Sequence, residues 1–482
     1  MGYKVGKDKL QLTFLPPCLD DYVAEDHICR VIFAFTQQLD MVSLGFKYAE
    51  SSSVGNRPYD PRMMLNLYIY GYLNRVRSSR RLEAETLRNV EVMWLMDGLH
   101  PDDKTISNFR KDNTTALRDM FRAFNKMCLK FGLFGGEISA TDGTKIRANS
   151  SRKKIHNQTT VKRELSLIDK RISEYLNKLD EADSIEAGEI MPRAVQIQEA
   201  LEKLRERKEM YKDFLTQMEI EEKNEISTGD PDAHLMRQGG DGRHIDACYN
   251  VQTVVDGKHG LIVDYEVIER SDDKGNLLNM SERAMDIMET ETLSNLADKG
   301  YYDGEDIAAC EKRGVTCLVS KPKAGGAQKS EGFRREQFIY NREEDYYLCP
   351  CKSQLKFMRM QKDNNGKECR LYANYHACNN CACRCECTKG RYRKILRLSY
   401  QDTLDIVDER TKNNKELYRK RQEIVEHPFG TIKKVWGYRQ FLCRTKPKVS
   451  AEMSLTYLAY NMRRAVNIFK EKGSNLVEAM GG

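Results

Sequence analysis

The amino-acid sequence predicts an α/β protein with a mixed sheet flanked by helices, preceded by an all-helical region. From about residue 228 onward, strand-like runs alternate with helix-like runs, which is typical of a mixed sheet covered by helices. Before about residue 135, apolar residues recur at helical spacing. Two further segments, a charged helical stretch and a cysteine-rich stretch, interrupt the α/β pattern and indicate insertions.

Composition limits the classes of protein to consider. The chain has 482 residues, of which 40% are hydrophobic and 31% charged, enough for two or three soluble domains. It contains no apolar run of about 18 residues and no apolar signal-peptide core, so we expect a cytoplasmic protein without a membrane partner. A net charge of +7 is only weak evidence for a nucleic-acid partner. Fifteen cysteines without a secretory signal indicate a reducing compartment.

The N-terminal region predicts a helix-turn-helix arrangement. One helix is expected to begin at Asp60-Pro61, because proline suits the first helical turn. After a break at His100-Pro101, a short helix carries the cationic side chains of Lys104 and Arg110. The helix expected over RRLEAETLRNVEVMWLMDGL, after Ser78-Ser79, is joined to this basic helix by a tight turn. The pair matches a DNA-binding layout, and Lys104 and Arg110 are candidate DNA contacts. A plain helical bundle with a solvated basic face is the alternative.

Residues 155–227 predict an antiparallel helical hairpin. Apolar residues recur there every three or four positions on both sides of the turn-like stretch DEADSIEAGEIMP. The repeating positions are Leu165, Ile168, Ile172, Leu176 and Leu179, then Ile197, Leu201, Leu204, Tyr211 and Leu215. Because strand-like sequence resumes after it, we interpret the hairpin as an insertion with a solvated charged surface.

Three separated carboxylates carry the main chemical prediction. Asp142 lies in a strand-like run, Asp298 ends a buried strand, and Glu426 lies in the stretch EIVEHPFGTIKK. Acids in apolar settings usually pair with a positive partner, often a metal ion. Brought together by the fold, they would hold two divalent cations able to drive phosphodiester chemistry. Taken singly, the two aspartates could be turn residues and the glutamate a surface residue.

The chain resembles the bacterial insertion-sequence transposases of the DDE type, in the subgroup with a helical N-terminal domain and a cysteine-rich insert. The resemblance is carried in order by RPYDPRMMLNLYIYGYL, TISNFRKDN, ATDGTKIRANSS, GDPDAHLM, ACYNVQTVVD, ADKGYYDG and VEHPFGTIKK. It implies a helical DNA-binding domain (residues 1–135) and an RNase H-like catalytic domain (136–482). The catalytic domain would be interrupted by the hairpin (155–227) and the cysteine-rich insert (341–395).

The resemblance also assigns site residues. Asp142 and Asp298 match the two catalytic aspartates, and Glu426 matches the catalytic glutamate. Related transposases carry a Tyr-x2-Arg-x3-Glu-x6-Lys pattern around that glutamate. Here Lys433 keeps the gap of six residues, whereas the gap between Arg421 and the glutamate is four.

That departure leaves Glu423, which is separated from Arg419 by three residues, as a weaker candidate for the third acid, although Gly430 stands where its lysine would be. By position, the candidate DNA-contacting residues of this domain are Tyr418, Arg421, Lys433, Lys145 and Arg147.

The implied activity is cleavage at insertion-sequence ends and strand transfer, with Mg²⁺ (or Mn²⁺) at the active site. The implied partner is double-stranded DNA, both terminal inverted repeats and target DNA, bound by a homodimer in association with the nucleoid. Two alternatives stay open: a catalytically silent DNA-binding derivative of a transposase, and a host nuclease of the same fold.

The cysteine-rich insert predicts a structural zinc site. Cys349 and Cys351 are followed about 27 residues later by five more cysteines, a spacing that resembles a zinc ribbon. By resemblance, the favoured ligands are Cys349, Cys378, Cys381 and Cys387. Cys351, Cys383 and Cys385 could substitute, and reduced thiols without metal are the alternative.

Overall fold

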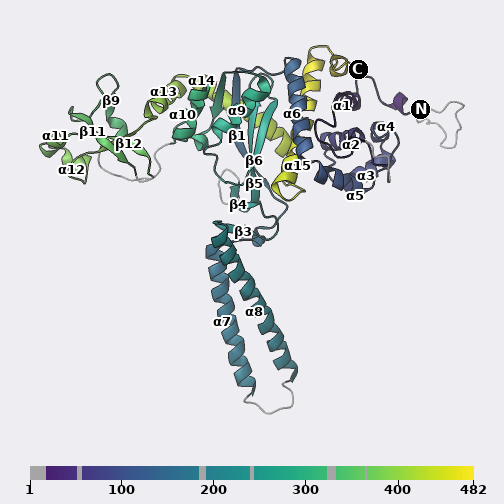
Figure 1. Ribbon diagram of the computed structural model, residues 1–482, viewed down its shortest axis with the longest axis horizontal. Coiled ribbons are helices and arrows are strands. Elements are labelled where there is room, and N and C mark those ends of the chain that lie inside the picture. The colour runs from purple at the N-terminus through teal and green to yellow at the C-terminus, as the bar shows by residue number, and fades with distance from the viewer. Residues whose placement is uncertain are drawn as a thin grey trace, which may run out of the picture.

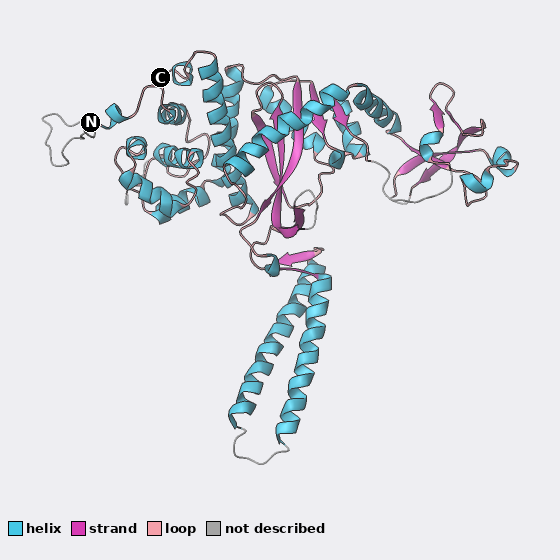
Figure 2. Ribbon diagram, turned by 180° about the vertical axis from the view of Figure 1, so that it is seen from behind, coloured by secondary structure: helices cyan, strands magenta, loops and turns pink. Residues whose placement is uncertain are grey.

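The computed structural model describes residues 18–50, 57–183, 191–238, 244–322, 333–363 and 366–481. Its centre is an α/β body, with the N-terminal helices on one side and a small antiparallel sheet on the other (Figure 1). A long helical hairpin projects from the centre, and Figure 2 shows the same arrangement from behind. No helix among these residues is long and apolar enough to cross a membrane.

The N-terminal region is helical, as predicted. Its helices are α1 (Ile28–Gln37), α2 (Pro61–Leu73), α3 (Ser79–Arg88), α4 (Val90–Leu95), α5 (Asp103–Asp112) and α6 (Thr114–Lys130). Helix α2 begins at Pro61, and the Asp60 side chain caps it by accepting a hydrogen bond from the Arg62 amide. Helix α5 is the basic helix expected after His100-Pro101, and it packs against α3.

The central sheet is mixed, as the alternation predicts. It contains β1 (Ile138–Arg147), β4 (His234–Gln238), β5 (His244–Asp256), β6 (Ile262–Ile268), β7 (Leu293–Ala297) and β8 (Val315–Val319). The order is β4-β5-β1-β7-β8, with β6 also paired to β5. Strands β1, β7 and β8 are parallel, while β5 runs antiparallel to β1. The parallel strands therefore end at one edge, where α/β proteins usually place their sites.

Helices from later in the chain cover this sheet. They are α9 (Leu277–Met288), α10 (Gly304–Arg313), α13 (Gln401–Asn413), α14 (Lys415–Phe429) and α15 (Lys446–Glu471), followed by the short α16 (Leu476–Ala479). A π-helical turn, Gly430–Val435, extends α14. The deeply buried α15 packs against α2 and α6 as well as β6, so one continuous hydrophobic core runs from the N-terminal helices into the sheet. Glu452 on α15 is fully buried and pairs with Arg77 at 3.2 Å, which ties the two regions together.

The hairpin predicted for residues 155–227 is formed by α7 (Gln158–Asp183) and α8 (Met191–Ile220). A small ribbon, β2 (Ile155–Asn157) with β3 (Glu225–Ser227), closes its base. Val161, Ile168, Tyr211 and Met218 form its separate small core. Part of the predicted turn, residues 184–190, and the side chain of Leu179 lie outside the described residues.

The cysteine-rich segment forms a five-stranded antiparallel sheet. Its elements are β9 (Ile339–Asn341), β10 (Tyr346–Leu348), β11 (Gln354–Lys362), β12 (Glu368–Ala373), α11 (Tyr375–Asn379), α12 (Arg384–Cys387) and β13 (Ile395–Leu398). Five buried residues form its core: Phe338, Tyr347, Leu355, Tyr372 and Ile395. Such a small core gives only marginal stability to a sheet of this size.

Candidate active site

Asp142 and Asp298 are neighbours at the edge where the parallel strands end. In the β1–β7 register Thr141 lies opposite Ala297. Asp142 directly follows Thr141, and Asp298 directly follows Ala297. The Asp298 carboxylate accepts a hydrogen bond from the Gly300 amide at 2.6 Å, which fixes its orientation at the end of β7. Two acids about 150 residues apart in sequence are thus brought to one place by strand pairing.

The Asp142 carboxyl is held in an unusual electrostatic setting. Its side chain is 27% exposed, and Arg421 lies 3.6 Å away. Burial and the nearby charge of Asp298 raise the pKa of Asp142 to about 7, although Arg421 acts in the opposite direction. A carboxyl group with such a pKa needs a cation close by to be fully ionised at neutral pH.

Helix α14 and the π-helical turn after it contact this edge through three of the residues predicted to bind DNA. The Tyr418 hydroxyl donates to the Ala297 carbonyl at 3.2 Å, and Arg421 pairs with Asp142. In the π-helical turn, the Lys433 ammonium donates to the Lys145 carbonyl at 2.9 Å, and burial lowers its pKa to about 8. The polar groups of Tyr418 and Arg421 are therefore engaged in contacts within the protein, and Lys433 is mostly buried.

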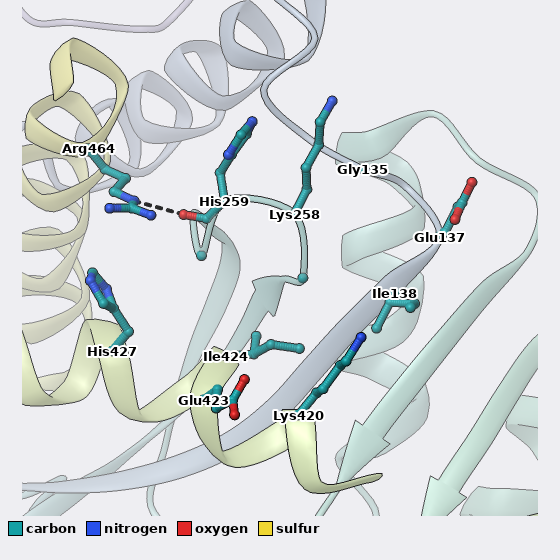
Figure 3. Close-up of a pocket in the computed structure, with 12 residues that line it drawn as sticks. Gly135, Glu137, Ile138, Lys258, His259, Lys420, Glu423, Ile424, His427 and Arg464 are labelled. Atoms are coloured by element: carbon teal, nitrogen blue, oxygen red, sulfur yellow. Dashed lines mark hydrogen bonds between the residues drawn. The ribbon is translucent and has the colours of Figure 1, made fainter. Parts of the chain in front are cut away.

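Glu426 lies on the same helix but makes no hydrogen bond or ion pair with the aspartates. Its side chain is exposed, five residues after Arg421. Glu423, the alternative candidate for the third acid, lines a separate cavity of about 680 Å³ with Ile138 and His259, at the start of β1 (Figure 3). Asp142 and Asp298 do not line that cavity.

A third aspartate, which the sequence interpretation missed, also approaches this edge. Asp273 lies in the loop between β6 and α9, and its Oδ1 accepts hydrogen bonds from the Asn250 amide at 2.9 Å and the Gln252 amide at 2.7 Å. Its charge contributes to the raised pKa of Asp142. The local sequence SDDKGN resembles an ordinary turn, so the sequence offered no signal beyond a pair of adjacent acids.

The surroundings of these acids fit a divalent cation. The buried Asn250 Oδ1 has no hydrogen-bond partner, although it lies beside the carboxylates. Gly143 and Gly300 let the acidic side chains approach the backbone closely, because a Cβ on Gly143 would lie 2.4 Å from Asp273 Oδ1 and one on Gly300 would lie 2.8 Å from Asp298 Oδ1. Carboxylate and amide oxygens are the ligands that Mg²⁺ prefers.

Two protein-family models match this chain. One model, a transposase domain (DUF772), matches residues 17–112, and a second, the transposase DDE domain, matches residues 224–462. The chain belongs to the insertion-sequence DDE transposases. Asp273, Asp298 and Glu426 fall within the second match, whereas Asp142 and the helical hairpin lie between the two. No curated protein and no solved structure matches the chain.

The basic residues predicted to contact DNA differ in their availability in this transposase. Lys104 on α5 is exposed. Arg110, on the same helix, is turned inward: it donates to the Tyr72 hydroxyl at 3.2 Å and lies over the Tyr68 ring. Arg147 is exposed but pairs with Asp246 at 3.2 Å. Arg110 is therefore placed as a structural residue, because its guanidinium is used within the helical region.

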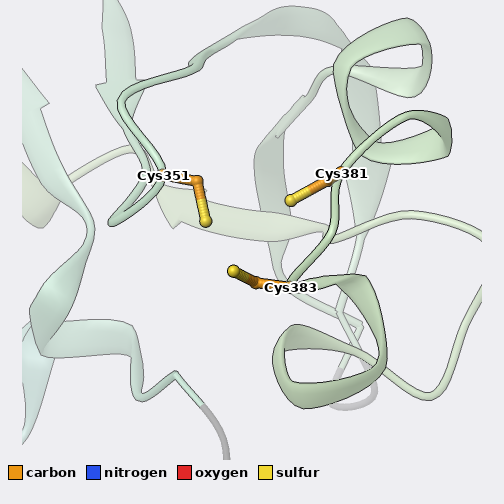
Figure 4. A group of neighbouring side chains, drawn as sticks. All are labelled: Cys351, Cys381 and Cys383. Atoms are coloured by element: carbon orange, nitrogen blue, oxygen red, sulfur yellow. The ribbon is translucent and has the colours of Figure 1, made fainter.

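The cysteines of the transposase gather differently from the expected set. The sulfur atoms of Cys351, Cys381 and Cys383 all lie within 4.8 Å of one another and point together (Figure 4). Cys349, Cys378 and Cys387 instead pack against the small core beside this group. Among the described residues, no three of the favoured ligands come within that separation of one another. Cys381 is the one member common to both sets.

Proposed function

We propose that this transposase cuts DNA at insertion-sequence ends and joins them to target DNA through a site built on Asp142, Asp298 and Glu426. The observation that carries the proposal is the pairing of β1 with β7, which sets Asp142 beside Asp298 at the carboxyl ends of parallel strands. The strand order, with antiparallel β6 and β5 next to parallel β1, β7 and β8, supports an RNase H-like interpretation of the sheet.

Glu426 is the proposed third acid because α14 is the helix that packs against the Asp142 edge. Arg421 and Tyr418 attach this helix to Asp142 and Ala297. The side chain of Glu423 faces the separate cavity of Figure 3 and is less suited to the role. The exposed position of Glu426 leaves its carboxylate available to a cation or to DNA.

Each residue of the site has a proposed task. Asp142, Asp298 and Glu426 would hold Mg²⁺, or Mn²⁺ in its place, with the carboxyl proton of Asp142 leaving when the cation binds. The cation would supply the acidity that turns a water or a terminal 3′-hydroxyl into a nucleophile, and charge stabilisation for the leaving oxygen. Arg421 keeps the Asp142 carboxylate oriented, while Lys104, Lys145 and Arg147 are the proposed contacts to DNA phosphates.

A cleavage assay tests this assignment. The DNA flanking the gene should contain matching inverted repeats, and these ends provide the substrate for the full-length protein, proposed to act as a homodimer on DNA. Asp142→Asn, Asp298→Asn and Glu426→Gln should each abolish cleavage and strand transfer while retaining binding of the ends in a gel-shift assay. Glu423→Gln is the matched control, and it should remain active.

The opposite pattern, with Glu423→Gln inactive and Glu426→Gln active, would move the third acid to Glu423. A wild-type protein that binds the ends and never cuts them with Mg²⁺ or Mn²⁺ would instead favour the catalytically silent derivative. Cleavage without strand transfer would favour a nuclease, which the two transposase matches do not.

We also propose a structural zinc ion in the cysteine-rich sheet, with Cys381 among its ligands. The three close sulfur atoms in Figure 4 support Cys351 and Cys383 as its companions, in addition to the set favoured by resemblance. Cys385 is exposed and serves as the control. Metal analysis should find zinc in the wild-type and Cys385→Ser proteins but not in Cys381→Ser. If active wild-type protein contains no zinc, the cysteines are reduced thiols without a metal.

A further inference from the structure

Asp273 is held as rigidly as the two aspartates that the sequence identified. The two amide donors on Asn250 and Gln252 come from adjacent inward positions of β5, the strand paired with β1. The Gln252 amide is itself oriented, because the buried Tyr301 hydroxyl donates a hydrogen bond to its Oε1. A carboxylate fixed through a neighbouring amide and tyrosine has little freedom to turn away.

The second oxygen of Asp273 faces the other acids. Asp273 Oδ2 and Asp298 Oδ1 both lie within 3.3 Å of a single point, the position that a Cβ on Gly300 would occupy. Beyond Thr141, β1 has no paired residue in β7, so the two strands part just before Asp142 and Asp298. Asp273 therefore reaches the edge from the α9 side, while Asp142 faces α14.

The charges at this edge are unbalanced. Asp142, Asp273 and Asp298 contribute three carboxylates, and among the described residues only Arg421 forms an ion pair with any of them. The Lys433 ammonium lies in the same region but donates to the Lys145 carbonyl. Three acidic side chains beside one paired guanidinium, in a partly buried setting, favour the uptake of a divalent cation.

We propose that Asp273 is a further metal-binding acid of the transposase, acting with Asp298 and Asp142 on the cation side of the site. This inference rests on the proposed function of the two other aspartates. The second oxygen of Asp273, the Asn250 Oδ1 without a hydrogen-bond partner and the Asp298 carboxylate form one side of the cation site. The alternative, in which Asp273 only anchors the loop before α9, requires no contact with a metal ion.

Mn²⁺ binding to the full-length protein without DNA separates these two roles. Free Mn²⁺ would be counted by electron paramagnetic resonance during a titration of wild type, Asp273→Asn and Asp272→Asn. Asparagine keeps an oxygen that can accept from Asn250 or Gln252, so the loop anchor survives. Asp272 is the adjacent, exposed acid and is therefore the matched control.

We expect Asp273→Asn to weaken Mn²⁺ binding by at least about tenfold, and Asp272→Asn to leave it unchanged. Wild-type Mn²⁺ affinity in a folded Asp273→Asn protein would overturn the inference. Asp142→Asn serves as the benchmark: if it too binds Mn²⁺ normally, the proposed active site itself is wrong. If only Asp142→Asn loses Mn²⁺, the role of Asp273 alone is refuted.

Metal rescue gives a second readout that does not depend on the asparagine variant. In Asp273→Cys, cleavage of the inverted-repeat ends should be lost with Mg²⁺ and partly restored with Mn²⁺, because thiolates bind softer metals better. A residue that only anchors a loop would show no such dependence on the metal. Equal activity of this variant in the two metals would count against a ligand role.

Discussion

Replacing Asp142 by asparagine should stabilise the metal-free transposase above neutral pH. The folded protein holds this carboxyl in a site that disfavours its charge, because burial and Asp298 raise its pKa to about 7 from an ordinary 3.8. In the unfolded chain the same group ionises freely. An asparagine side chain has nearly the same shape and carries no charge.

The magnitude follows from the difference between the two pKa values. At about 1.4 kcal/mol for each tenfold change in acidity, the shift corresponds to at most about 4 kcal/mol of unfolding free energy. The raised folded-state pKa means that wild-type stability falls as the pH rises from 4 to 7 and stays low above that. The advantage of Asp142→Asn should therefore be negligible near pH 4, grow up to pH 7 and then level off.

Urea unfolding at pH 4.5, 6, 7 and 8.5, monitored by tryptophan fluorescence, measures this difference in stability between Asp142→Asn and wild type. Trp94 and Trp436 both pack against the shared core and report on it. The buffers would contain no added divalent cation, but also no chelator, so that the cysteine-rich sheet is undisturbed. Asp272→Asn serves as the control for loss of an exposed negative charge.

With added Mg²⁺, the wild-type protein should become more stable than Asp142→Asn. A cation that binds the folded wild type stabilises it in proportion to the logarithm of its concentration, and the variant lacks the ligand for that gain. If Asp142→Asn is less stable than wild type at pH 8.5 without metal, or if the gap does not change with pH, the electrostatic reasoning about this site is wrong.

Outcomes are also expected for four further substitutions. Gly143→Ala should abolish cleavage, as measured on inverted-repeat DNA, because its Cβ would lie 2.4 Å from Asp273 Oδ1 and 2.6 Å from Gln252 Nε2. Full activity of this variant would show that the close approach of these two side chains to β1 is not needed. Lys104→Ala should lower the salt dependence of DNA binding by about one unit of the log–log slope without changing the unfolding midpoint. Arg110→Ala should instead lower the midpoint, since its guanidinium bonds the Tyr72 hydroxyl, and equal effects of the two substitutions would contradict this division. Glu452→Ala should cost about 3–5 kcal/mol of stability in urea unfolding by leaving Arg77 without its buried partner, and a loss below 1 kcal/mol would refute that estimate.

Local sequence patterns were sufficient for much of the secondary structure and for placing two candidate acids at strand ends. Helix α2 begins at Pro61, the hairpin helices follow their apolar repeat, and Asp298 ends a buried strand, because these features depend on neighbours within a few residues. The same patterns identified Asp142. They could not place Glu426 relative to the aspartates, since the orientation of a helix over a sheet depends on contacts such as that between Arg421 and Asp142.

The sequence by itself determined the transposase family, the mixed sheet and the candidate acids, because those are carried by residue types and their order. Only the tertiary structure decided which polar groups meet. It added Asp273, whose role depends on β5 side chains and on the end of β7, and it turned Arg110 inward. It also gathered Cys351, Cys381 and Cys383, whereas the family resemblance favoured another set. Seven cysteines and several acids satisfy the same local rules, and only packing in three dimensions selects among them.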